Sequence, residues 1–234
     1  MDRLRYLLSK WNIELSAYQL EQFDKYYDLL ISWNEKMNLT AITDRTEVIE
    51  KHFFDSIALA SFSDIDGKRI LDMGSGAGFP GIPLKIVYPD SNIVLIDSLA
   101  KRVNFLNTVI NDLCLKNIVA VHGRAEDYAR NSEYREKFDV VTSRAVANLS
   151  VLSEYCIPYV KVGGMFAPYK SSNISEEVDA AINAIDILGG KLIEVKEYNL
   201  PETDYARSIV YIKKVRNCSK KYPRKAGVPA KSPL

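Results

Sequence analysis

The sequence is poor in the residues that build metal centres and disulfide frameworks. It holds two histidines and three cysteines in 234 residues. Two histidines are too few for most histidine-based metal sites, and no pair of cysteines has zinc-site spacing, so we expect no metal. The cysteines are widely separated and odd in number, which is typical of reduced thiols in a cytosol.

Long apolar runs are also missing. No uninterrupted stretch approaches the ~20 apolar residues that a bilayer span needs. The segment MDRLRYLLSKWNIEL contains neither the apolar run nor the small-residue cleavage site of a secretory signal. We therefore expect a cytoplasmic protein with no membrane contact.

The chain has little net charge, +1, but its basic residues gather at one end. No acidic residue occurs from position 213 onward, whereas eight basic ones do: Lys213, Lys214, Arg216, Lys220, Lys221, Arg224, Lys225 and Lys231. Two interpretations fit this basic tail, which we place at 217–234. Either it binds a polyanion, or it is a solvated, disordered tail that aids solubility.

The order of apolar patterns predicts an α/β fold in one structural domain. Residues 1–64 show helical spacing, with Ser16 and Gln19 as a capping box, and form a predicted N-terminal helical cap. Residues 65–216 alternate short apolar strands with helices, which indicates a seven-stranded, mainly parallel, Rossmann-like sheet. Only the polar segment PETDYAR separates the last two strands, so these should form an antiparallel hairpin.

A glycine-rich loop follows the first core strand. The string ILDMGSGAGFPG places Asp72 before three glycines at alternate positions, Gly74, Gly76 and Gly78. Glycine permits positive φ angles and close approach of a ligand to the backbone, and the helix that follows presents free N–H groups. Asp97 ends the next strand, where a carboxylate can accept hydrogen bonds from ribose hydroxyls. The alternative is a turn that only tightens the packing of strand and helix.

Adenosine occurs in both NAD and S-adenosylmethionine, so Asp97 alone does not separate an oxidoreductase from a methyltransferase. Two features favour S-adenosylmethionine. An acidic residue at position 72 is typical of methyltransferases and is not needed for a pyrophosphate, and a C-terminal hairpin belongs to the methyltransferase sheet.

Further candidates lie at the ends of later strands. Ala125 and Glu126 follow the third strand and are expected to read the adenine, although Glu126 could instead cap a helix. Arg144 follows the fourth strand, where amine-methylating enzymes carry an Asn/Asp-Pro-Pro-Tyr motif. Arginine cannot accept from an amine, but it binds phosphate, carboxylate or the O6/N7 edge of guanine. We therefore expect an acceptor with its own lone pair, such as guanine N7; the alternative is a surface ion pair. Lys170 could contact a phosphate or lie in solvent, and Cys114 and Cys156 fit a core.

These motifs resemble the bacterial small-subunit ribosomal RNA guanine-N7 methyltransferases, also called glucose-inhibited division protein B. The resemblance covers nearly the whole chain. It is carried by Asn38-Leu39-Thr40, His52-Phe53-Phe54-Asp55-Ser56, LDMGSGAGFPGIPLKI, Ser143-Arg144-Ala145, Tyr169-Lys170 and KYPRKAGVPAKSPL. Ser171 and Ser208 depart from the family pattern, which usually has glycine and often has histidine at these two places.

The resemblance implies cofactor contacts from Gly74, Phe79, Ala125 and Glu126. It places Arg144 near both the cofactor and the target base, and it implies that the reaction uses no general base. It also implies that Arg124, Lys170 and Arg207 contact the RNA, and we refer to such residues as the RNA-side residues. We add Lys220, Lys221, Arg224 and Lys225 of the basic tail to that side on charge. Asn38 and His52 are expected to support the contact between cap and core.

The sequence thus predicts a monomeric enzyme that transfers a methyl group from S-adenosylmethionine to N7 of a guanine in a loop of 16S ribosomal RNA, in the small ribosomal subunit. Two alternatives stay open at this point. One is an NAD-dependent oxidoreductase, and the other is a non-catalytic RNA-binding assembly factor with the same fold.

Overall fold

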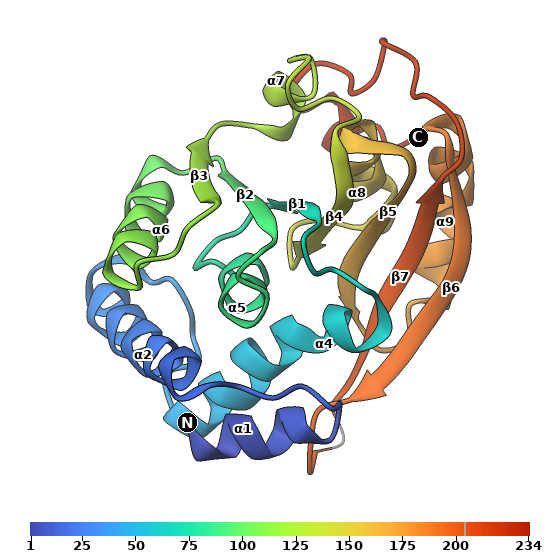
Figure 1. Cartoon of the computed structure of the whole chain (residues 1–234). Coiled ribbons are helices and arrows are strands. Elements are labelled where there is room, and N and C mark those ends of the chain that lie inside the picture. Colours follow the sequence, from blue (N-terminus) through green and yellow to red (C-terminus); the bar gives the residue numbers. More distant parts are fainter. Residues whose placement is uncertain (204) are drawn as a thin grey trace.

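A computed structural model describes residues 1–203 and 205–234. Its centre is a seven-stranded sheet with the order β3-β2-β1-β4-β5-β7-β6 (Figure 1). Strand β7 runs antiparallel to β5 and β6, and the other pairs are parallel, which confirms the predicted mainly parallel sheet and its final hairpin. The strands are β1 Arg69–Met73, β2 Asn92–Asp97, β3 Ile118–His122, β4 Phe138–Arg144, β5 Val160–Ser171, β6 Gly190–Asn199 and β7 Ala206–Lys214.

Helices cover both faces of the sheet, as strands that are apolar on both sides require. Alternate residues of β1 show this, since Ile70 joins one hydrophobic cluster and Leu71 the other. The first cluster packs under α5 (Gly81–Val87) and α6 (Ala100–Asp112). The second packs under α8 (Leu149–Cys156), the 3-10 turn η2 (Ile157–Tyr159) and α9 (Ser175–Ile187).

The N-terminal region is helical, and its helices share the first hydrophobic cluster with the sheet. They are α1 Asp2–Ser9, α2 Ala17–Met37, α3 Arg45–Val48, the π-helical segment η1 Ile49–Phe54, and α4 Asp55–Phe62. The predicted capping box is confirmed: the Gln19 N–H donates to Ser16 Oγ at 3.2 Å, and the Ser16 N–H donates to Gln19 Oε1 at 2.9 Å.

The π-helical segment η1 was not foreseen from the sequence. It interrupts what reads as one amphipathic helix, and His52 lies within it. Because a π turn spaces residues differently from an α turn, it changes which side chains share a face. The segment thereby carries Phe53 and Phe54 into the core while His52 remains partly buried at its edge.

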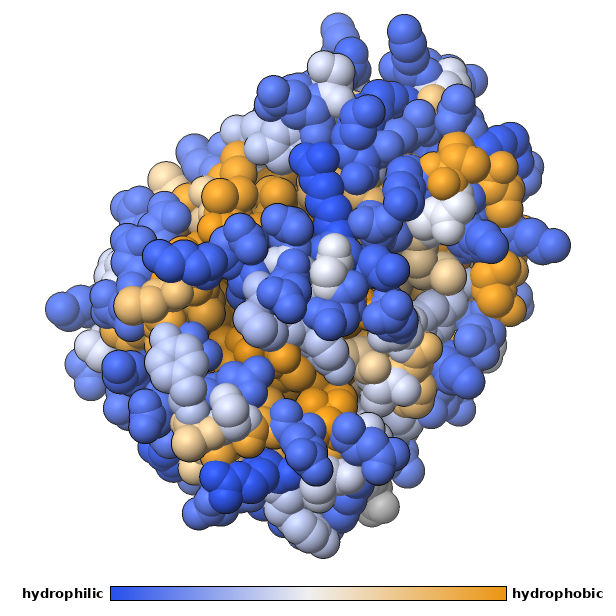
Figure 2. Space-filling model, viewed as in Figure 1, coloured by the Kyte–Doolittle hydropathy of each residue, from blue (hydrophilic) through white to orange (hydrophobic). Residues whose placement is uncertain are grey.

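The basic tail folds back on the body. Cys218, Tyr222 and Pro229 are buried, and the tail contains the short helix α10 (Val228–Lys231). The alternative of a disordered tail is therefore wrong. The rim that α7 (Ala125–Tyr128) and this tail form in Figure 1 is largely hydrophilic in Figure 2.

The two cysteines that we expected in the core differ in exposure. Cys156 is buried as expected, whereas Cys114 is exposed, because it lies in a turn after α6 with a φ of 53°. Among residues 1–203 and 205–234, no helix has the length and hydrophobicity of a membrane span.

Tyr26→Phe tests how the N-terminal helices support the sheet. The buried Tyr26 hydroxyl of α2 donates to the carbonyl oxygen of Ala77, in the loop after β1. Loss of the Tyr26 hydroxyl leaves the Ala77 carbonyl oxygen without this partner, so we expect the free energy of unfolding to fall by about 1–2 kcal/mol in a urea titration. The matched control is Tyr27→Phe, whose exposed hydroxyl bonds Thr43, and it should cost less than about 0.5 kcal/mol. Equal losses in the two variants would contradict the prediction.

Candidate functional site

The glycine loop joins β1 to α5 at the carboxyl edge of the sheet. Gly74, Gly76 and Gly78 have φ angles of 74°, 59° and 96°, a region that other residues rarely adopt. Space is limiting as well, because a Cβ at Gly74 would lie 2.5 Å from the Val146 side chain. One at Gly78 would lie 2.7 Å from the Tyr26 hydroxyl. The loop therefore needs glycine for both its backbone conformation and its packing.

Asp72 lies beneath this loop. Its side chain is fully buried, and Oδ2 accepts a hydrogen bond of 3.0 Å from the Gly81 N–H at the start of α5. Oδ1 has no partner within the described residues. Burial raises the pKa of this carboxyl to about 7. Asp72 thus supports the turn between β1 and α5, and its contact with a cofactor remains a prediction.

Asp97 fixes the loop from the neighbouring strand. Its Oδ2 accepts from the Gly76 N–H and its Oδ1 from the Leu99 N–H, both at 2.9 Å. Arg102 Nη1 lies 3.6 Å from the same carboxylate, which is only 2% exposed. Asp97 therefore joins the end of β2 to the glycine loop. Its role as a ribose ligand remains a prediction.

A cavity of about 300 Å³, the smaller of two cavities at this edge of the sheet, opens beside the glycine loop, between the ends of β1, β2 and β3. Gly74, Arg124, Ala125 and Glu126 line it together, as their positions at successive strand ends predict. The wall also contains residues that sequence reasoning missed: Met73, Ile96, Ser98, Gly123, Val146, Tyr155 and Gly227.

Glu126 faces this cavity with its carboxylate mostly buried. The residue stands in the first turn of α7, but the helix has no side-chain cap, so the capping alternative is not what the structure shows. Its Oε1 accepts from the Gly227 N–H at 3.3 Å instead. Ala125 lies next to it, held through its carbonyl oxygen by the Tyr159 hydroxyl.

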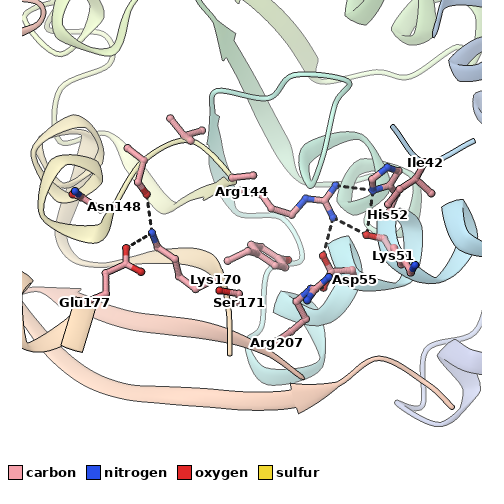
Figure 3. A pocket seen from close by; sticks show the side chains of 14 residues that line it. Ile42, Lys51, His52, Asp55, Arg144, Asn148, Lys170, Ser171, Glu177 and Arg207 are labelled. Carbon is pink, nitrogen blue, oxygen red and sulfur yellow. Dashed lines mark hydrogen bonds and ion pairs between the residues drawn. The ribbon is translucent and has the colours of Figure 1, made fainter. Parts of the chain in front are cut away.

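A larger cavity of about 710 Å³ adjoins the first, and Val146 lines both. Figure 3 shows Arg144, at the end of β4, reaching across it toward α4 and η1. Its Nη1 donates to Asp55 Oδ2 at 2.8 Å, and the Asp55 side chain is 4% exposed. Arg144 is thus held by a buried carboxylate partner and is not a surface ion pair.

His52 and Phe79 support this arginine. The His52 ring stacks on Phe79 with centroids 4.6 Å apart, and the Arg144 guanidinium lies 4.9 Å from the centre of the same phenyl ring. Burial, with Arg144 nearby, lowers the pKa of His52 to about 3, so the imidazole is neutral near pH 7. Phe79 is buried between the N-terminal helices and the sheet, outside both cavity walls. The contact of Phe79 with a cofactor remains a prediction.

Lys170 has an internal role. Its Nζ donates to Glu177 Oε1 at 2.6 Å and to the Ala147 carbonyl oxygen at 2.8 Å, as Figure 3 shows. Glu177 Oε1 also accepts from the Leu149 N–H, at 2.6 Å. These bonds fix the loop after β4, where Val146 stands against Gly74. Lys170 is only 11% exposed, so it is not the solvated lysine of one alternative.

The remaining predicted RNA-side residues divide into two groups. Arg124, Lys220, Lys221 and Lys225 are exposed, and Arg207 lines the larger cavity with its Nε 3.8 Å from Asp55 Oδ1. Arg224 lines neither cavity, and it forms a closer ion pair, at 2.6 Å, with the buried Glu154.

The sheet order and the glycine turn at its carboxyl edge give the chain the Rossmann-like fold that is found in S-adenosylmethionine-dependent methyltransferases. Solved structures share this fold at low sequence identity. The enzyme TYW2 of M. jannaschii in complex with AdoMet matches with a TM-score of 0.56 and 15% identity, over 75% of this chain and 80% of its own. A SAM-dependent methyltransferase from Aquifex aeolicus matches with a TM-score of 0.55 and 18% identity, over 78% and 97%.

Sequence comparison identifies the family. The family model described as rRNA small subunit methyltransferase G matches residues 19–209. A protein of Lachnoclostridium phytofermentans named Ribosomal RNA small subunit methyltransferase G is 58% identical over 97% of this chain and 94% of its own. A protein of the same name from Staphylococcus epidermidis is 54% identical over 97% and 95%. The chain belongs to the rRNA small subunit methyltransferase G family.

Asp72→Asn should remove a pH dependence of folding. Because its pKa is about 7 in the folded chain and 3.8 ordinarily, the folded state holds more protons between these values. This carboxyl therefore lowers the free energy of unfolding as pH rises from about 4 to about 7, by up to about 1.4 kcal/mol per pH unit. Asparagine cannot ionise, so the stability of the variant relative to wild type should rise over that range.

Denaturant titrations at several pH values measure this difference. Asp28→Asn, on the exposed face of α2, is the control and should give a difference that does not change with pH. A constant difference for Asp72→Asn as well would show that this carboxyl is ionised throughout.

Proposed function

We propose that this chain transfers a methyl group from S-adenosylmethionine to N7 of a guanine in a loop of 16S ribosomal RNA. The observation that carries the proposal is the junction of the two cavities at Val146. One cavity lies on the glycine loop, as an adenosine-containing donor requires, and the other contains Arg144. A base held in the larger cavity would face the donor across this junction.

The smaller cavity fits the donor chemically. Gly74 brings the backbone of the glycine loop to the cavity wall, Ala125 and Glu126 supply backbone and carboxylate groups for an adenine edge, and Ser98 offers a hydroxyl just after β2. Bound S-adenosylmethionine would supply an electrophilic methyl group on its sulfonium. Gly76 would act indirectly, by fixing the shape of the loop, and Asp97, which accepts from the Gly76 N–H, would also bind the ribose hydroxyls.

The larger cavity fits an acceptor that attacks with its own lone pair. His52 is neutral and hydrogen-bonded to the Thr40 hydroxyl at 2.8 Å, and Asp55 is paired with Arg144. Neither group is arranged to take a proton, and N7 of guanine has none to lose. The task of the site is then to position the base, and proximity and orientation supply most of the rate. Arg144 would bind the guanine O6 edge or a neighbouring phosphate.

RNA binding would draw on four exposed basic residues, Arg124, Lys220, Lys221 and Lys225. The half-buried Arg207 in the larger cavity also remains in the proposed RNA-side set. Lys170 and Arg224 are each paired with a carboxylate of the chain at 2.6 Å, so they would bind RNA directly only by exchanging that partner. The target guanine must be unstacked, since duplex RNA hides its deep groove. We place the target in the small ribosomal subunit, and the proposed enzyme acts as a cytoplasmic monomer.

The direct test is methylation of ribosomal RNA with labelled S-adenosylmethionine, followed by mapping of the modified nucleotide. Label on a single guanine, at N7, is the expected result. Label on another base or atom would overturn the choice of acceptor. Binding of NAD in place of S-adenosylhomocysteine in calorimetry would favour an oxidoreductase, and donor binding with no transfer would favour an assembly factor.

Arg144→Lys tests the positioning of the base with little disturbance of the fold. Lysine keeps a positive charge beside Asp55 but lacks the planar fork that holds a base edge or a phosphate. We expect the single-turnover methylation rate to fall by about 100-fold, with the Kd for S-adenosylhomocysteine within about twofold of wild type. Arg216→Lys, in an exposed ion pair with Asp186, is the control and should retain full activity. A wild-type rate for Arg144→Lys would remove this residue from the proposed site.

Replacing Lys220, Lys221 and Lys225 by glutamine tests the role of the exposed tail charges. The salt dependence of RNA binding should become shallower, by about 0.7 in the slope of log K against log salt for each phosphate that a lysine no longer neutralises. Filter binding over a range of potassium chloride concentrations measures this slope. An unchanged slope would show that the three lysines do not bind RNA phosphates.

A further inference from the structure

We infer that the C-terminal segment, residues 217–234, forms part of the donor-binding cavity and is required for donor affinity. The inference rests on the proposed function, since it takes the smaller cavity as the donor site. It differs from a role in RNA binding, which is what the charge of this segment suggests from the sequence. Three sets of contacts carry it.

The first is an anchor between Arg224 and Glu154. Glu154 lies on α8 with its side chain 1% exposed, and its carboxylate accepts four hydrogen-bond contacts from Arg224. The backbone N–H donates to Oε1 at 2.7 Å and Nε donates to the same atom at 3.0 Å, while Nε and Nη2 donate to Oε2 at 3.1 and 2.6 Å. A buried carboxylate with this many bonds from one residue fixes the position of that residue closely.

The second set holds the beginning of the segment. Arg135, in the connection before β4, donates to the carbonyl oxygens of Cys218, Ser219 and Tyr222 at 2.9, 3.1 and 2.9 Å. Arg130 adds a bond of 3.3 Å to the Pro223 carbonyl oxygen. Arg130 and Arg135 thus hold the backbone of the segment through its carbonyl oxygens, and bound RNA is not needed to keep the segment in place.

The third set reaches the cavity itself. Gly227, three residues beyond Arg224, lines the cavity, and its N–H donates to Glu126 Oε1. Tyr155, next to Glu154 on α8, lines the same cavity. The anchor and the cavity wall are therefore neighbours both along α8 and along the C-terminal segment.

Glu126 is the residue through which the segment would act on the donor. Engagement of its Oε1 by Gly227 fixes the side chain and leaves Oε2 to accept from a ligand. When the segment is displaced, Glu126 loses this partner and the cavity loses the Gly227 wall. Arg224 is in this sense a positioning residue, which acts on the donor only through Gly227 and Glu126.

Arg224→Met, compared with Lys225→Met, tests the inference in the full-length protein. Both variants remove one positive charge from the segment, but Lys225 is exposed and only Arg224 holds Glu154. Calorimetry with S-adenosylhomocysteine, without RNA and well below the melting temperature, should give a Kd raised by about tenfold or more for Arg224→Met. The Kd of Lys225→Met should stay within about twofold of wild type. In steady-state assays the KM for the donor should rise in Arg224→Met, with little change in the KM for RNA.

Gly227→Val is the second variant, and it decides the matter if Arg224→Met does not fold. It leaves the Arg224–Glu154 pair intact but places a β-branched residue at a φ of 80°, so the segment must move at the cavity wall. A similar loss of affinity for S-adenosylhomocysteine supports the inference. Wild-type affinity in the folded variants would overturn it and leave the proposed function standing. Failure of the wild-type protein to bind S-adenosylhomocysteine would overturn the proposed function as well.

Discussion

The turn between β1 and α5 depends on two carboxyl groups in the interior of the protein. Asp72 binds the first N–H of α5 from below, and Asp97 binds the Gly76 N–H from the neighbouring strand. Both are almost completely buried, so their hydrogen bonds are strong and their alternatives few. The glycines give the loop its unusual backbone angles, but the carboxylates determine which of the accessible conformations it takes. The shape of the proposed donor cavity depends on this loop, because Gly74 forms part of the cavity wall.

A second constraint governs the larger cavity, where an arginine has to be held in place without losing its capacity to bind. Asp55 accepts a hydrogen bond from one edge of the Arg144 guanidinium, the Phe79 ring lies against the guanidinium, and the His52 ring stacks on Phe79. Because His52 is neutral, it adds no competing charge to a cavity that already contains Arg144 and Arg207. The arrangement resembles a holder for an anion or a base edge more than an acid–base pair, which agrees with an acceptor that needs no deprotonation.

The sequence predicted the sheet, the final hairpin and the capping box because each depends on local periodicity or spacing. It also placed Ala125 and Glu126 correctly in one cavity with Gly74, since the ends of parallel strands meet at one edge. The sequence could not show which way a side chain turns. Phe79 points into the core, Lys170 bonds Glu177, and Asp72 lies beneath its own loop. Val146 and Tyr155 gave no sequence signal, because only tertiary packing brings them to the cavity.

The C-terminal segment shows why a count of charges does not identify a partner. Its basic residues read as one cluster in the sequence, yet Arg224 binds a carboxylate inside the protein while Lys220, Lys221 and Lys225 face solvent. The contact between Gly227 and Glu126 joins residues 101 positions apart, and neither is unusual in its own sequence context. In the proposed enzyme, a segment held in this way would serve both substrates, with its anchored residues at the proposed donor cavity and its exposed lysines available to RNA. These two roles require different residues, and variants at neighbouring positions can therefore separate them.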